Sequence, residues 1–203
     1  MTIQFKSNKS HKTGKQIVLI FEIHQHVIDV DLLKAISIYL NCGKVEIGVK
    51  VGSPDTLIYR LRISSQTDIF NILFPILKKS TFMLNKRQQN LRLFIEACIM
   101  VKNKQHTSQE GQYKLQSIRS QFYSQLSLEE KNKIAKSETS INAKRVTGFT
   151  DAEGHFSFLM TKNKKGKLVS PLFRFVITQE TTELDFIKSL IPFCGCGTVN
   201  TQK

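Results

Sequence analysis

The chain has 203 residues, enough for one large domain or two small ones with a hydrophobic core. Thirty Lys and Arg against 16 Asp and Glu give a formal net charge of +14, which favours a polyanionic partner. No apolar run approaches the roughly 18 residues of a membrane span, so we expect no membrane partner. Four cysteines are too few for a disulfide framework.

The N-terminal part is predicted to form two strands and a helix. Residues 2–6 and 16–25 have the apolar alternation of strands, and a basic loop joins them. A helix follows, capped by Asp29 or Asp31, and ends near Tyr39.

A second strand pair is predicted next. Residues 44–51 alternate polar and apolar side chains, and residues 57–63 pair with them across a turn that contains Gly and Pro. The polar side of this pair carries Lys44, Arg60 and Arg62. A ribbon with such a face can lie in a nucleic-acid groove, so these three side chains are candidate contacts.

Helices occupy the middle of the chain. One is predicted to run through Phe74 and to be interrupted by Pro75. A second covers roughly 88–101, and a third begins after the capping sequence Thr107-Ser108-Gln109-Glu110. The polar stretch 136–142 is the predicted linker to the rest of the chain.

An internal repeat organises the sequence. Residues 21–25 (Phe-Glu-Ile-His-Gln) match residues 175–179 (Phe-Val-Ile-Thr-Gln) at an offset of 179 − 25 = 154. Cys42-Gly43 meets Cys196-Gly197 at the same offset. We therefore predict two copies of one supersecondary unit.

The second copy repeats the opening of the first. Strands are predicted at 155–161 and 172–179, joined by the basic loop 162–167, and a helix at 183–193. Two lysine-rich loops at equivalent positions favour phosphate binding, and charge alone does not distinguish DNA from RNA. The candidate contacts in the loops and on the second strand are Lys6, Lys9, Lys12, Lys162, Lys164, Lys165 and Arg174.

A run of small residues at 143–154 ends in two acids. Carboxylates are unfavourable at a helix C-terminus, so Asp151 and Glu153 indicate a place where a cation collects. Gly148 belongs to a smooth strip on which another helix can pack closely. Gly154 is predicted to adopt a left-handed conformation that ends the helix.

The run Val146-Thr147-Gly148-Phe149-Thr150-Asp151-Ala152-Glu153-Gly154 resembles the signature of LAGLIDADG homing endonucleases. The resemblance implies an α+β fold, with an antiparallel β-saddle covered by helices on one face and duplicated along the chain. It also implies that two acidic helices come together, so that their acids share divalent metals above double-stranded DNA. The second copy carries the only such run, so the first repeat is expected to lack its acidic helix. The second repeat is expected to lack its C-terminal half.

The resemblance also implies roles for particular residues. Glu153 matches the metal-binding acid, with Mg²⁺ as the expected ion, and Asp151 is taken as structural. Gln25 and Gln179 match glutamines that order metal-bound water. Lys86 is the candidate for stabilising charge at the scissile phosphate, with Arg87 as its alternative.

The expected domain boundaries are 1–135 for the first repeat, 136–142 for the linker and 143–203 for the second repeat. With one acid and no partner, the chain alone is expected to make no double-strand breaks, and to be monomeric once the absent helix completes it. The alternatives are an RNA maturase that assists splicing of its host intron, and a non-catalytic DNA-binding remnant. Abundant Lys, Ile and Asn are typical of an AT-rich genome, which favours a mitochondrial gene over a chloroplast one.

Overall fold

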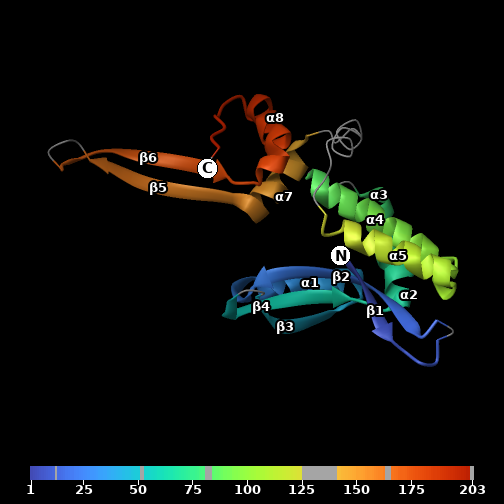
Figure 1. The fold of residues 1–203 in the computed structure, drawn as a ribbon. Helices are drawn as coiled ribbons and strands as arrows, with labels where there is room; N and C mark the ends of the chain where they lie inside the picture. The colour runs from blue at the N-terminus through green and yellow to red at the C-terminus, as the bar shows by residue number, and fades with distance from the viewer. Residues whose placement is uncertain (12, 51–52, 81–83, 125–140, 163–165, 202–203) are drawn as a thin grey trace. The chain divides into compact units, whose positions relative to one another are not determined.

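The computed structural model describes the whole chain except residues 12, 51–52, 81–83, 125–140, 163–165 and 202–203 (Figure 1). The chain divides into two compact units. The first comprises Met1–Phe82 and Lys86–Ile134, and the second comprises Met83–Asn85 and Ala135–Lys203. Within the described part of the chain, every helix is too short or too polar to cross a lipid bilayer.

The first unit is built on a four-stranded antiparallel sheet with the order β1-β2-β4-β3. Its strands are β1 (Thr2–Ser7), β2 (Lys15–His26), β3 (Lys44–Lys50) and β4 (Ser53–Ile63), which confirms the predicted strands to within a few residues. The long strand β2 serves two neighbours. It pairs with β1 along its first half and with β4 along its second half.

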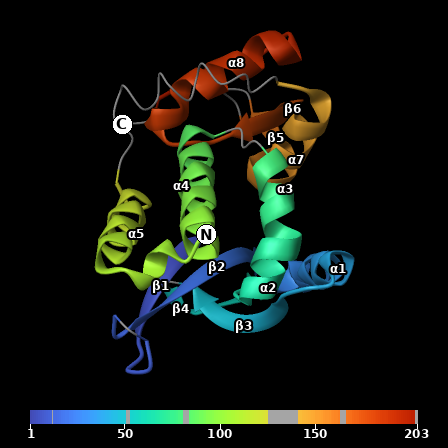
Figure 2. The same ribbon diagram turned by 90° about the vertical axis from the view of Figure 1, so that its right-hand side faces the viewer.

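One face of this sheet forms the hydrophobic core. Ile3, Ile17, Leu19 and Ile63 are at most 3% exposed. They pack against α4 (Asn85–Lys102) and α5 (Gln109–Gln121), which lie over this part of the sheet in Figure 2. The buried contributions from these two helices include Leu91, Phe94, Ala97, Cys98, Leu115 and Ile118.

A short 3-10 turn, η1 (Val27–Asp29), leads from β2 into α1 (Val30–Leu40), which packs on β2, β3 and β4. The predicted helix end is confirmed, because Asn41 adopts a left-handed conformation with φ 49°.

The prediction that Pro75 interrupts a helix is wrong. The helical path continues from α2 (Gln66–Asp68) through the π-helical turn η2 (Ile69–Leu73) into α3 (Phe74–Lys79). Pro75 lies in the first turn of α3, where its missing N–H is not needed. The π-helical turn therefore accommodates the proline.

The second unit contains α7 (Ala143–Glu153), β5 (Gly154–Lys162), β6 (Leu168–Ile177), η4 (Thr181–Glu183) and α8 (Leu184–Cys194). Strands β5 and β6 form an antiparallel hairpin. Asn142 caps α7, because its side chain accepts a hydrogen bond from the backbone N–H of Arg145.

The structure confirms the internal repeat. Both η1 and α1 recur as η4 and α8 with every boundary displaced by 154 residues, and Gly195 ends α8 in the left-handed conformation that Asn41 has after α1. The hairpins differ by one residue. Thr2 faces Ile20 in the first, but Ser157 faces Arg174 in the second, so the chain between these paired residues is one residue shorter in the second hairpin.

The predicted left-handed conformation of Gly154 is wrong. Its φ is −80° and its ψ is 140°, because β5 starts directly at the end of α7. A glycine is needed there for space, since a Cβ would lie 2.5 Å from the carbonyl oxygen of Thr150 and 2.9 Å from the ring of Phe175.

Candidate nucleic-acid interface and acidic centre

The solvent face of the first-unit sheet is polar and charged. The pairing of β3, β4 and β2 aligns their side chains in two rows that run across the strands. The first row is Lys44–Arg62–Glu22. The neighbouring row is Glu46–Arg60–His24. Because alternate residues point to one face of a sheet, all six side chains share this face. Arg60 and Arg62, both predicted site residues, lie side by side at its centre.

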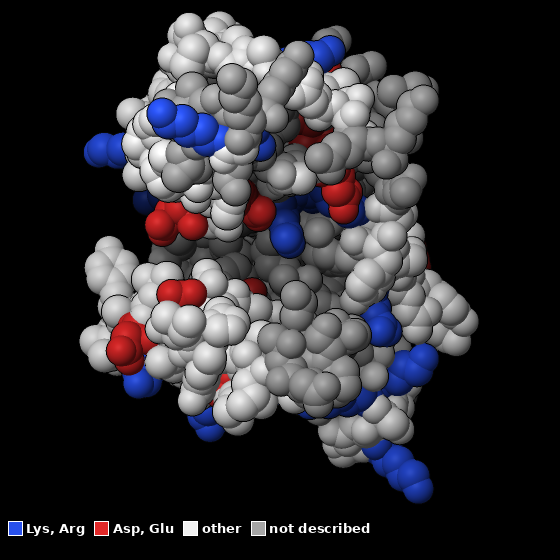
Figure 3. All heavy atoms as spheres, turned by 90° about the vertical axis from the view of Figure 1, so that its left-hand side faces the viewer, with Lys and Arg blue, Asp and Glu red and all other residues white. Residues whose placement is uncertain are grey.

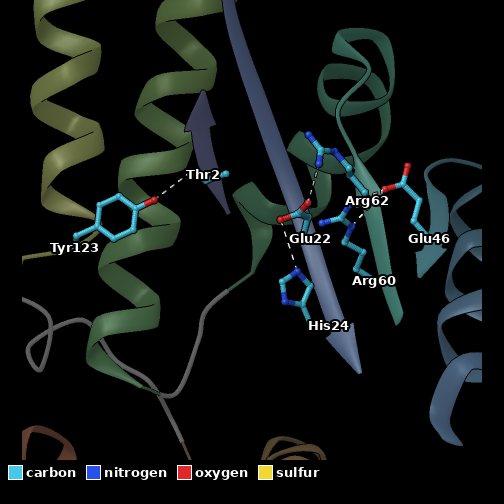
Figure 4. Close-up of polar contacts among 7 residues, drawn as sticks. All are labelled: Thr2, Glu22, His24, Glu46, Arg60, Arg62 and Tyr123. Atoms are coloured by element: carbon cyan, nitrogen blue, oxygen red, sulfur yellow. Dashed lines mark hydrogen bonds and ion pairs between the residues drawn. The ribbon is translucent and has the colours of Figure 1, made fainter. Parts of the chain in front are cut away.

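Ion pairs hold the two arginines in opposite directions across the sheet (Figure 4). Arg62 Nη1 lies 3.3 Å from Glu22 Oε1 on β2. Arg60 Nη2 lies 3.3 Å from Glu46 Oε2 on β3.

Glu22 also approaches His24, with 3.6 Å between Glu22 Oε2 and His24 Nε2. Sequence reasoning missed Glu22, Glu46 and His24. The alternation of 44–51 was visible, but the partner of each arginine depends on strand register.

The remaining basic candidates are spread over loops and strand ends. Lys6, Lys9 and Lys44 are exposed in the first unit, and Arg174 is exposed on β6 in the second. On the face drawn in Figure 3, Lys and Arg side chains reach the surface among Asp and Glu side chains. Lys12, Lys164 and Lys165, and the side chain of Lys162, lie outside the described residues.

The acidic centre is the C-terminal turn of α7. Asp151 and Glu153 are both exposed, and Gly148 lies on an open helix face where an added Cβ would meet nothing within 4 Å. Because Gly154 pairs with Ile177, the end of β6 lies beside the end of α7. Gln179 is two residues beyond Ile177 and half-buried, so it belongs to the same end of the hairpin as Glu153.

The other two catalytic candidates belong to the first unit. Gln25 lies near the end of β2 and is half-buried. Lys86 lies at the start of α4, and its Nζ donates to the carbonyl oxygens of Gln121, at 3.0 Å, and Ser124, at 2.5 Å. These carbonyls are at the C-terminus of α5, where a cation is favourable, so Lys86 ties the two helices together.

A divalent cation would find hard oxygen ligands at the end of α7. Carboxylates of this kind suit Mg²⁺ and Ca²⁺, and the exposed Glu153 fits this chemistry. Among the described residues, however, no group of three or more His, Cys, Asp or Glu is placed to hold a metal ion. The described residues therefore offer carboxylates at the end of α7 but no complete set of ligands.

The β5–β6 hairpin carries an exposed aromatic face. Phe156 stacks on Phe175 with 4.8 Å between ring centroids, and Phe158 lies 5.2 Å from Phe173. Phe173 is 77% exposed, whereas Leu19, its equivalent in the first repeat, is 1% exposed. The two copies therefore differ in what covers this face of the sheet.

These features describe a duplicated α+β protein with an open charged sheet face and an exposed acidic helix end. The family model of the LAGLIDADG endonuclease matches residues 1–98 and 146–203, so the chain belongs to this family. The resemblance of the acidic run is thereby confirmed.

Relatives in Neurospora crassa support the assignment. A probable intron-encoded endonuclease 3 is 25% identical over 206 residues, covering 95% of this chain and 37% of the relative. A probable intron-encoded endonuclease 2 is 24% identical over 217 residues, covering 97% of this chain and 45% of the relative. The chain thus spans less than half the length of these curated relatives.

Solved structures share the fold. I-SmaMI bound to an uncleaved DNA target in the presence of calcium ions superposes with a TM-score of 0.80 at 22% identity, covering 99% of this chain and 70% of that one. The LAGLIDADG homing endonuclease I-LtrWI bound to target DNA gives a TM-score of 0.80 at 22% identity, covering 100% of this chain and 70% of that one. The predicted fold class is confirmed.

Proposed function

We propose that the chain acts in metal-dependent hydrolysis of DNA phosphodiester bonds at a long, specific site, as a homing endonuclease does. The observation that carries the proposal is the end of α7, where Glu153 is exposed beside the β5–β6 hairpin. The open charged sheet of the first unit and the net charge of +14 support double-stranded DNA as the substrate.

The sheet face is the proposed surface for sequence readout. Guanidinium groups form bidentate hydrogen bonds with guanine in the major groove, and carboxylates accept from cytosine. Arg60 and Arg62 would read bases, while Lys6, Lys9, Lys44 and Arg174 would contact phosphates and make affinity depend on salt.

In the proposed chemistry, Glu153 would help to hold Mg²⁺, an ion that would supply activation of water and stabilisation of the departing oxygen. The side-chain amide of Gln179 would orient the attacking water, and Gln25 would do so at the first repeat. Asp151 would keep the end of α7 in place. Lys86 is retained as a candidate for the scissile phosphate, in competition with its contacts to α5.

The sequence contains one acidic run of this type, so we propose that cutting both strands needs a second acidic helix. The chain alone would bind DNA and make no double-strand breaks. The names of the relatives support an intron-encoded gene, and the abundance of Lys, Ile and Asn suits the AT-rich genome of a mitochondrion.

The strand register suggests a direct test. Ser157 is the structural equivalent of Thr2, so residues 142–155 joined directly before Met1 would place a second acidic helix in the equivalent position. Target DNA is first selected from randomised duplexes in Ca²⁺. The extended chain is expected to cut the selected DNA in Mg²⁺, and Glu153→Gln in that chain should abolish cutting while binding persists.

A matched control replaces the glutamate of the added segment by glutamine, which should also prevent double-strand cleavage. Binding without cleavage by the extended chain would contradict the assignment of Glu153. Double-strand cleavage by the original chain would contradict the need for a second acid. Selective binding of structured RNA over duplex DNA would favour the maturase function instead.

A further inference from the structure

A pocket of about 390 Å³ opens in the first unit, at a distance in sequence from the acidic run. One wall is the β1–β2 loop with the start of β2, which contributes His11, Thr13 and Lys15. The other wall is the segment between α4 and α5, which contributes Lys104, His106 and Thr107. Among the described residues, every one that lines the pocket is basic or carries a hydroxyl, and none is acidic.

Buried polar contacts join the two walls. The side-chain amide of Gln112, which is 7% exposed at the start of α5, donates to Thr13 Oγ1 and to the carbonyl oxygen of Lys15, the latter at 3.4 Å. Because the acceptors lie at the end of the β1–β2 loop and at the first residue of β2, Gln112 fixes this end of the loop against α5. The pocket is therefore built into the fold rather than formed by a chance approach of side chains.

The second wall is equally constrained. Gly111 allows the segment to approach α5, since a Cβ there would lie 1.9 Å from the carbonyl oxygen of Gln105. Lys104 adopts a left-handed conformation with φ 57°, and Thr107 Oγ1 donates to its carbonyl oxygen at 2.7 Å. These contacts hold Lys104 and Thr107 at the pocket edge.

Lys15 and Lys104 bring positive charge to the pocket, and its described lining contains no acid. Burial lowers the pKa of His106, and the neighbouring His11 lowers that pKa further, against an opposing effect from the backbone of Val101. His106 Nδ1 is buried and lacks a hydrogen-bond partner. Lys15 and Lys104 line the same pocket, and a bound anion would offset their charge.

We propose that this pocket is a phosphate-binding site. Ammonium groups, imidazoles and hydroxyls are the donors that phosphate oxygens accept from, and charge-assisted hydrogen bonds of this kind are strong. The phosphate is either a backbone phosphodiester of bound DNA or free inorganic phosphate. The site would clamp one phosphate through two segments that Gln112 connects.

The test compares Lys104→Asn with Lys102→Gln in the full chain. Asparagine tolerates the left-handed conformation of residue 104, and Lys102 is exposed outside the pocket, so the two variants lose the same charge at neighbouring positions. Inorganic phosphate binding is measured by calorimetry against chloride at constant ionic strength. Affinity for duplex DNA is measured as a function of salt concentration.

If free phosphate is the ligand, Lys104→Asn should weaken its binding about tenfold while Lys102→Gln leaves it unchanged. If the ligand is DNA, Lys104→Asn should lower the slope of log affinity against log salt by about 0.9, and Lys102→Gln should not. Both variants behaving like the original chain in both assays would overturn the proposal. Absence of DNA binding by the original chain, with phosphate binding retained, would refute the proposed function and leave this site standing.

Discussion

Replacing Lys86 by methionine separates a structural role from a catalytic one. The half-buried ammonium donates to Gln89 Oε1 at 3.1 Å and to the carbonyl oxygens of Gln121 and Ser124 at the end of α5. A hydrogen bond to a charged group contributes about 1.5–3 kcal/mol, and a cation at a helix C-terminus about 0.3–1 kcal/mol. Because the three bonds share one group and are not additive, we expect Lys86→Met to lower the free energy of unfolding by about 2 kcal/mol.

The assay is urea unfolding followed by circular dichroism, with Arg87→Met as the matched control. Arg87 is exposed on the neighbouring position, so its replacement should change the free energy of unfolding by less than about 0.5 kcal/mol. The reasoning is refuted if Lys86→Met unfolds at the same urea concentration as the original chain. Loss of cleavage in the extended chain, at unchanged stability, would instead support a role at the scissile phosphate.

Four further substitutions test the packing and the burial of His106. Gly111→Ala should lower the free energy of unfolding by about 3 kcal/mol, because its Cβ would overlap the carbonyl oxygen of Gln105, and an unchanged urea midpoint would contradict this contact. Phe94→Ala, at a fully buried position, should lower the free energy of unfolding by about 3–5 kcal/mol. Phe173→Ala, at a position 77% exposed, should lower it by less than about 1 kcal/mol. Equal losses would show that the aromatic face is covered in solution. Folding lowers the pKa of His106 from 6.5, so the stability that depends on a neutral His106 is present above about pH 6.5 and is lost as the pH falls below that value. The urea midpoint of His106→Gln should therefore fall less between pH 7.5 and pH 5 than the midpoint of the original chain.

The repeat was the part of the fold that sequence predicted best. Residues 21–25 and 175–179 match because they perform the same local task, ending a strand before a 3-10 turn and a helix. The conformation of Gly154 was predicted wrongly, because a glycine is needed at this position to leave room for the ring of Phe175 and the carbonyl oxygen of Thr150. A local rule for helix ends contains neither of those atoms.

The candidate site was predictable only where its chemistry is contiguous in sequence. Asp151 and Glu153 stand within one run, so their presence at a helix end could be inferred. The contacts of Lys86 lie 35 and 38 residues further along the chain, and the link from Gln112 to Thr13 spans 99 residues. Such contacts depend on how helices dock, which neither periodicity nor capping patterns encode.

In the proposed function, the covered sheet of the first repeat reads DNA bases, and the second repeat, with its open hairpin, supplies the acid. In the first unit, α4 and α5 pack on one face of the sheet, and Arg60 and Arg62 pair with their glutamates on the opposite face. In the second unit the corresponding apolar face is exposed, and the acid is carried on α7. In the proposed function, base readout depends on the sheet of the first unit and metal binding depends on the end of α7. Glu46→Gln is therefore expected to change base preference while the extended chain still cuts in Mg²⁺, whereas Glu153→Gln is expected to abolish cutting while base preference is kept.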